Sequence, residues 1–402
     1  MLATTLVMSA CASGGGGGAS TSSTITVGSI LDQTGPLDIY GKEMQAATKL
    51  AIKDINGHGG VLGKKLNLLS YDAQSDNSLY TQDANTLANQ DHVAVVMGGV
   101  SSASREAVRP VVDLAKTLYF YNEQYEGGVC DQNTFLTGVV PSQQLAALIP
   151  YAIQHFGKRL YIVAADYNYG HISATWVQKY AHQYGGSVVN TEFIPLTSTD
   201  FSSVINHIQA ARPDVIVSLL VGGNHISFYR QFYSAGLNAS IHIVSPTFGL
   251  GNEQVILPYT EDKGIVVAYP YFQELSNPAN AAFVTLWNKT YGASYPYISD
   301  SAVAVWNGWH LWAAAVKKAG STDRAKVIAA LQSQPGVSVD SPSGTVTMNG
   351  ASHHVTQDVS IAQTDSSRGF TILSTQTAVP PSYENQVCNL IKNPSTDKQF
   401  TP

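Results

Sequence analysis

The chain contains few charged residues for its length. Asp, Glu, Lys and Arg make up 12% of its 402 residues, about half of the share of roughly 25% that is usual in soluble domains. The net charge is −6, and Lys and Arg form no cluster. Because the nucleic-acid backbone selects clustered basic side chains, we exclude a nucleic-acid partner.

Long apolar runs are also absent from the body of the chain. No uninterrupted run reaches the length of about 20 residues that a membrane-spanning helix needs. The nearest candidate, "SAVAVWNGWHLWAAAV", contains Asn307 and His310 and is predicted to be a core helix. We therefore expect the body of the chain to stay outside the bilayer.

Motifs of catalysis and metal binding are missing as well. The sequence has no GxSxG, HExxH or CxxC. "GHGGVLGKK" departs from a phosphate loop at His58 and Lys65, and "GLGNEQ" lacks the third glycine of a dinucleotide-binding fingerprint. His353 and His354 are predicted to lie at a solvated strand edge rather than in a metal site. We expect no enzyme, no cofactor and no bound metal.

The N-terminus has the pattern of an export leader. "MLATTLVMSACA" is apolar and ends in small residues around Cys11, and a Gly/Ser-rich tether follows. This predicts a signal segment and tether over residues 1–23, with Cys11 as the lipidated residue of a bacterial lipoprotein. Met8 stands where Leu is usual, and no basic residue precedes Lys42. The alternative is a leader that carries a cysteine by chance.

Only three cysteines occur. If Cys11 carries lipid, Cys130 and Cys388 remain, and neither belongs to a Cys/His arrangement. In an oxidising compartment two remaining cysteines are more apt to pair than to stay free. We predict a disulfide that ties the loop "YNEQYEGGVC" to a C-terminal tail, residues 381–402.

The remaining chain alternates apolar strands with amphipathic helices, which predicts α/β architecture with parallel sheets covered on both faces. The pattern begins with "TITVGSILD" and restarts at "KRLYIVAAD", and the length also favours two domains. We expect two Rossmann-like lobes joined by a three-crossover hinge. The predicted first lobe comprises residues 24–140 and 272–335, and the second comprises residues 141–271 and 336–380.

Ligands of open parallel sheets bind beyond the carboxyl ends of the strands. Here those ends are loops such as "LDQTGPLDIYG", "GGVSSAS", "YNEQYEG", "DYNYG", "LVGGNH" and "SPTFGLGN". They are rich in Gly, Ser, Thr, Asn and Tyr and poor in charge. Such loops offer neutral hydrogen bonds and aromatic walls to a small polar solute.

The order "TGPLDIYGKEMQAATKLAIKDING", "GGVLGKKLNLLSYDAQSD", "GGVSSASREAVRPV", "YEG" and "AADYNYG" resembles the type I solute-binding proteins of ABC transporters, the leucine/isoleucine/valine-binding superfamily. The resemblance covers roughly residues 24 to 375. "YEG", "DYNYG" and "IPL" are similar to the urea and short-chain-amide branch. The resemblance implies an extracytoplasmic protein that binds an amide, urea or amino acid and delivers it to membrane permease subunits. It also leads us to expect a monomer as the oligomeric state.

The resemblance also implies site residues. Ser102, at a helix start, matches the serine that receives a carboxylate or amide oxygen, although Ser102 or Ser101 alone would also suit a helix N-cap. Tyr169 matches a tyrosine that closes over the ligand from the second lobe. The candidate ligand-binding residues, with their loops, are Ser101, Ser102, Tyr121, Asn122, Glu123, Gln124, Tyr167, Tyr169, Gly222, Gly223, Thr247 and Phe248.

Two questions stay open at this point. Glu123 either accepts N–H bonds from an ammonium or amide group or is a solvated loop charge. The alternative function is an amide- or amino-acid-sensing regulatory module of the same fold, which would be cytoplasmic and would not need a leader.

Lipidation of Cys11 gives a testable expectation. The full-length protein should fractionate with membranes, and Cys11→Ala should release it into the soluble fraction. Membrane association that persists in the Cys11→Ala protein would contradict the prediction.

Overall fold

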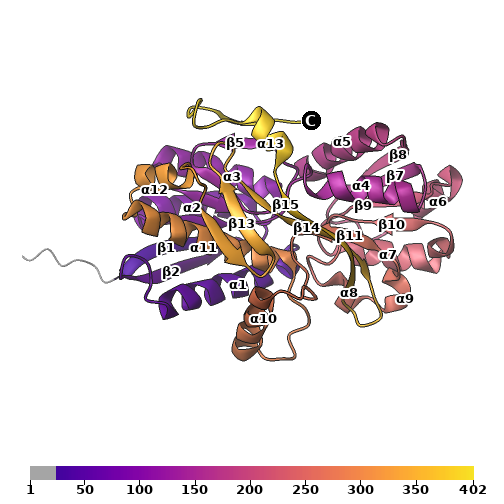
Figure 1. Cartoon of the computed structure of the whole chain (residues 1–402). Helices are drawn as coiled ribbons and strands as arrows, with labels where there is room; N and C mark the ends of the chain where they lie inside the picture. Colours follow the sequence, from indigo (N-terminus) through magenta and orange to yellow (C-terminus); the bar gives the residue numbers. More distant parts are fainter. Residues whose placement is uncertain (1–23) are drawn as a thin grey trace, which may run out of the picture.

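The computed structural model describes residues 24–402, and the predicted leader with Cys11 lies outside the described residues. Strands and helices alternate through two halves that lie side by side (Figure 1). Each half is built on a parallel sheet with helices on both faces, which confirms the predicted α/β fold class. Within the described part of the chain, no helix is long and apolar enough to cross a membrane.

The first half contains a parallel sheet in the order β2-β1-β3-β4-β6. Its strands are β1 (Thr24–Leu31), β2 (Lys65–Asp72), β3 (Val96–Gly98), β4 (Tyr119–Tyr121) and β6 (Thr134–Leu136). The helices are α1 (Asp38–Gly57), α2 (Asn77–Asn85), α3 (Ser102–Ala115), α11 (Asp300–Ala319) and α12 (Arg324–Leu331), and the π-helix η1 (Thr86–Gln90) extends α2.

Alternate side chains of these strands enter two different cores. Val27 and Phe120 belong to the core that α1 and α11 share, whereas Ile30 and Tyr119 belong to the core that contains Val108 of α3. Because successive strand residues point to opposite faces, both faces of the sheet must be covered. This is why the strands are almost continuously apolar.

The second half repeats this plan in the order β11-β10-β9-β7-β8, again parallel. Its strands are β7 (Arg159–Ala165), β8 (Ser187–Ile194), β9 (Val215–Leu219), β10 (His242–Val244) and β11 (Val266–Tyr269). Its helices are α4 (Gln144–His155), α5 (Asn168–Gln183), α6 (Ser202–Ala211), α7 (Asn224–Ser234), η2 (Leu237–Ala239), α8 (Glu253–Ile256) and α9 (Tyr259–Asp262). Helix α10 (Pro278–Tyr291) follows and precedes the return to α11.

One long strand, β14 (His354–Thr364), belongs to both halves (Figure 1). Its first residue pairs with Leu136 of β6, and its last residues run antiparallel to β11. The strands β12 (Ser338–Ser341) and β13 (Gly344–Asn349) join the first half, and β15 (Phe370–Val379) pairs with residues 357–364 of β14. We therefore propose that the lobe boundary runs through β14 and not, as predicted from the sequence, before residue 336.

The C-terminal tail is fastened to the first half. Its strand β16 (Asp397–Gln399) pairs antiparallel with β5 (Val129–Asp131), and a disulfide joins Cys130 to Cys388, 258 positions apart. Both cysteines are buried, and Asp397 accepts a hydrogen bond from the guanidinium of Arg109. Between β15 and β16 lies the short helix α13 (Ser382–Val387). The tail closes over the loop that precedes β5.

The prediction of a solvated edge at His353 and His354 is wrong. Both side chains are fully buried, and the His353 ring stacks on Phe135. The first residues of β14 lie beside β6, so the pair starts the strand that bridges the halves. Burial lowers the pKa of His353 to about 4 and that of His354 to about 3, which makes both rings neutral at pH 7.

The disulfide leads to a prediction about stability. Mass spectrometry of an unreduced digest should find the Cys130 and Cys388 peptides linked. The Cys130→Ser/Cys388→Ser protein should melt at a lower temperature, because the closed loop restricts the unfolded chain by up to roughly 5 to 6 kcal/mol in the chain-entropy model. A reducing agent should lower the melting temperature of the parent but not of the double variant. Two free thiols in the parent protein would contradict the prediction.

Candidate functional site

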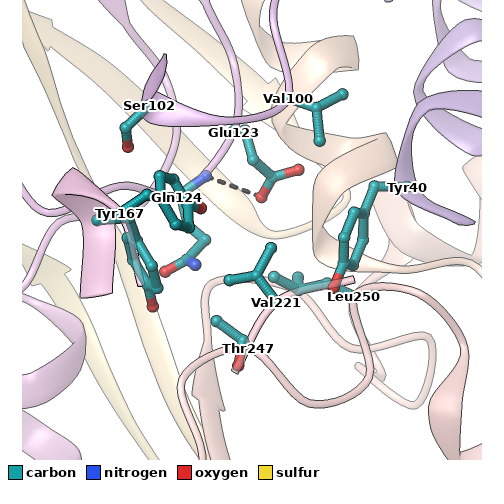
Figure 2. A pocket seen from close by; sticks show the side chains of 10 residues that line it. Tyr40, Val100, Ser102, Glu123, Gln124, Tyr167, Val221, Thr247 and Leu250 are labelled. Carbon is teal, nitrogen blue, oxygen red and sulfur yellow. Dashed lines mark hydrogen bonds between the residues drawn. The ribbon is translucent and has the colours of Figure 1, made fainter. Parts of the chain in front are cut away.

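A pocket lies between the two halves, beyond the carboxyl ends of their strands (Figure 2). The cavity volume that remains among its side chains is about 20 Å³. The pocket lies where ligands of open parallel sheets bind. The lining residues come from the first half, from the start of α5, and from the loops after β9 and β10. They are Tyr40, Val100, Ser102, Glu123, Gln124, Tyr167, Tyr169, Val221, Thr247 and Leu250.

The first residue of α3 contributes one wall. Ser101 occupies the N-cap position in extended conformation, and its side chain accepts a hydrogen bond from the backbone N–H of Ser104 at 3.0 Å. Ser102 is therefore free of the capping role and reaches the pocket. Its hydroxyl donates a hydrogen bond to the carboxylate of Glu126, which belongs to the loop after β4.

Glu126 is fully buried beside a cation. Arg105 Nη2 donates to Glu126 Oε1 at 2.7 Å, and neither side chain is exposed. Burial of two charges is unfavourable unless they pair and their remaining groups are hydrogen-bonded. Here Gln399 of the tail donates to the same oxygen at 2.6 Å, and Trp176 of the second half donates to the Glu126 carbonyl at 3.0 Å. The pair thus connects the pocket, the tail and the second half.

Glu123 supplies the one carboxylate among the described residues that line the pocket. Its Oε1 accepts the backbone N–H of Gln124 at 2.8 Å. Its Oε2 lacks a partner at hydrogen-bond distance, as does the buried hydroxyl of Ser301. The Ser301 hydroxyl lies close enough to act on this carboxyl as a hydrogen-bond donor, which lowers its pKa. In Figure 2 this carboxylate lies between Val100, Tyr40 and Val221. Burial raises the pKa of Glu123 to about 7.

The second half supplies aromatic and hydroxyl groups. Tyr167 and Tyr169 lie at the start of α5 with ring centroids 5.9 Å apart, and Tyr169 is 3% exposed. Thr247 follows β10, and its hydroxyl donates to the Leu220 carbonyl at 2.7 Å. Burial raises the pKa of both tyrosines, so their hydroxyls stay protonated at neutral pH.

Six predicted residues line the pocket: Ser102, Glu123, Gln124, Tyr167, Tyr169 and Thr247. The structure does not bring the other six to its wall. The hydroxyl of Tyr121 donates to the Val100 carbonyl and the amide of Asn122 to Thr137, so both side chains point into the first half.

The remaining predicted residues have structural surroundings. Gly222 donates its N–H to the Tyr40 hydroxyl at 2.8 Å, and Gly223 is the N-cap of α7. Phe248 is buried edge-on against Tyr229. Together with the N-cap Ser101, these residues shape the pocket from behind its lining.

Four lining residues were missed: Tyr40, Val100, Val221 and Leu250. Each lies in or beside a loop that was expected to face the ligand, but the polar neighbours were preferred. Tyr40 had a usable signal, because an aromatic residue in the first turn of α1 lies beyond the end of β1. The three aliphatic residues carry no sequence signal that separates them from the core.

Several known proteins are similar to this chain. A family model described as "Periplasmic binding protein" matches residues 24–369. Leu/Ile/Val-binding protein homolog 7 of Brucella suis biovar 1 is 25% identical over 293 residues, which cover 67% of this chain and 72% of that protein.

Solved structures show the same fold. A solute-binding protein of an ABC transporter from R. palustris, in complex with 4-hydroxybenzoate, superposes with a TM-score of 0.80 at 24% identity, covering 89% of this chain and 98% of that chain. An amino acid ABC transporter substrate-binding protein from Pseudomonas fluorescens Pf-5 has a TM-score of 0.79 at 20% identity, covering 91% and 99%. These relatives are solute-binding proteins and not enzymes. The family match spans most of the chain, and the chain therefore belongs to the periplasmic binding proteins of ABC transporters.

Proposed function

We propose that this solute-binding protein captures a small polar solute, an amide, urea or amino acid, between its two lobes and delivers it to the permease subunits of an ABC importer. The observation that carries the proposal is a pocket whose walls come from both lobes and are lined by tyrosines and by neutral and acidic polar side chains. A solute that contacts both walls has its full set of partners only when the lobes are closed. Lipid anchoring through Cys11 is part of the proposal.

The ligand should be sought by thermal shift with amino acids, amides, urea and polyamines. A ligand at 100 times its Kd stabilises the folded state by about 2.7 kcal/mol, which is readily measured. A broad library in which no compound raises the melting temperature would contradict solute binding at this site.

Ser102→Ala should weaken binding of the ligand found in that screen. The change removes a hydroxyl that faces the solute, and a loss of about 1 to 3 kcal/mol corresponds to roughly five- to 150-fold in Kd. Ser101→Ala is the matched control: it should lower stability by about 1 kcal/mol through the lost cap and leave Kd nearly unchanged. Calorimetry that finds equal losses of affinity in the two variants would contradict the assignment of Ser102.

Tyr169 tests the contribution of the second lobe. Tyr169→Phe removes the hydroxyl alone, while Tyr169→Ala also removes the aromatic wall and should weaken binding more. Small-angle scattering should show that the ligand makes the parent protein more compact and that Tyr169→Ala reduces this change at equal ligand concentration. Unchanged affinity and unchanged compaction in Tyr169→Ala would place the solute elsewhere.

A further inference from the structure

We infer that the solute carries a positively charged nitrogen, as in an amine, an amidine or the ammonium group of an amino acid, and that this nitrogen binds at Glu123. The inference rests on the proposed function and narrows its substrate class. Two observations support the inference. The first is which pocket groups can still donate a hydrogen bond, and the second is the set of charged groups around the pocket.

Two pocket hydroxyls already donate their single hydrogen bond to acceptors of the protein. A serine or threonine hydroxyl has one proton and two lone pairs. The Ser102 hydroxyl donates a hydrogen bond to the Glu126 carboxylate, and the Thr247 hydroxyl donates one to the Leu220 carbonyl at 2.7 Å. Both therefore present only lone pairs to a solute. The tyrosine hydroxyls and the Gln124 amide can donate or accept, so they do not decide the polarity.

Glu123 adds an acceptor that lacks a partner. Its side chain is buried, since the residue is 5% exposed, and the residue lines the pocket while its Oε2 lacks a hydrogen-bond partner. A buried carboxylate that is left unpaired is strongly unfavourable. A donor from the solute would complete it.

The surroundings of Glu123 contain no cation to balance it. The titratable groups that interact electrostatically with this carboxyl are Tyr40, Glu43, Tyr121, Tyr167, Tyr169 and Asp300. Among the described residues that line the pocket there is no Lys, Arg or His. The nearby Arg105 is paired with Glu126 through Nη2 and with Glu106 through Nε, while its Nη1 has no partner. A cationic solute would supply the missing charge.

Two more buried carboxyls, those of Glu43 and Asp300, lie near Glu123 and also favour a cationic solute over an anionic one. Glu43 of α1 accepts both the N–H and the hydroxyl of Ser299, and Asp300 of α11 accepts the N–H of Tyr271. Neither has a basic partner. Burial raises the pKa of Glu43 to about 8 and also raises that of Asp300, with the Glu123 charge contributing to both. A cationic solute would favour the ionised forms of these carboxyls, whereas a carboxylate in the pocket would disfavour them.

Two matched series of probes test the inference in the parent protein. The first is 4-hydroxybenzylamine, 4-hydroxybenzamide and 4-hydroxybenzoate, which differ only in the charged group. The second is leucine and its des-amino analogue 4-methylpentanoate. In at least one series the aminated compound should bind at least tenfold more tightly by calorimetry than the carboxylate that lacks the nitrogen.

The Glu123→Gln protein should lose at least tenfold of that preference. Glu192→Gln, which removes a carboxylate at β8 bonded to Tyr161 and His207, is the matched control and should keep the preference. If Glu123→Gln does not fold, the pH dependence of the parent gives an independent test. A cation requires ionised Glu123, so its affinity should rise with pH through about 7, whereas the affinity of an anion that needs the protonated acid should fall.

Tighter binding of 4-hydroxybenzoate and 4-methylpentanoate, or no preference in either series, would overturn the inference but leave solute binding intact. Failure of both aminated probes to bind would overturn it as well. Only a broad library without any binder would contradict the proposed function itself.

Discussion

The buried ion pair between Arg105 and Glu126 is the constraint on which the site depends. Neither side chain contacts solvent. Each oxygen of Glu126 accepts a hydrogen bond, which favours the buried pair, whereas Arg105 Nη1 has no partner. Those donors come from α3, from the tail and from the second half. Breaking such a pair by removing one partner typically destabilises a protein by about 3 to 5 kcal/mol, because the other charge stays buried alone. A residue outside the pocket lining thus holds three parts of the fold together.

The same pair sets the polarity of the pocket. Because the Ser102 hydroxyl donates its hydrogen bond to Glu126, its oxygen can only accept a hydrogen bond from a solute. The tail takes part through Gln399, which reaches Glu126, and the disulfide at Cys388 fastens the tail over this loop. The aromatic faces of Tyr121 and Tyr125 cover the guanidinium at 5.2 and 4.6 Å from its carbon. These tyrosines are therefore structural, although one of them stood among the predicted ligand residues.

The sequence predicted features that depend on local periodicity and missed those that depend on distant pairing. Strand and helix alternation was sufficient for the α/β class, and the helix start at Ser102 marked one wall of the pocket. The bridging role of β14 was not visible, because strand pairing across 218 positions of sequence, from Leu136 to His354, leaves no local pattern. For the same reason His353 and His354 were placed in solvent. The hydrogen bond from Gln399 to Glu126, the glutamate of "YEG", could not be predicted either, since the two residues lie 273 positions apart.

The unpaired oxygen of Glu123 explains how a solute would control closure. In an open cleft water can hydrogen-bond this carboxylate, and a closed cleft without solute leaves it buried and unsatisfied, at a free-energy cost of several kcal/mol for a charged group. The group can also take up a proton, since burial raises its pKa to about 7. A solute shifts the lobes toward closure only by its preference for the closed form. A donor that pairs with Glu123 has that preference, because it removes the penalty that disfavours the empty closed state.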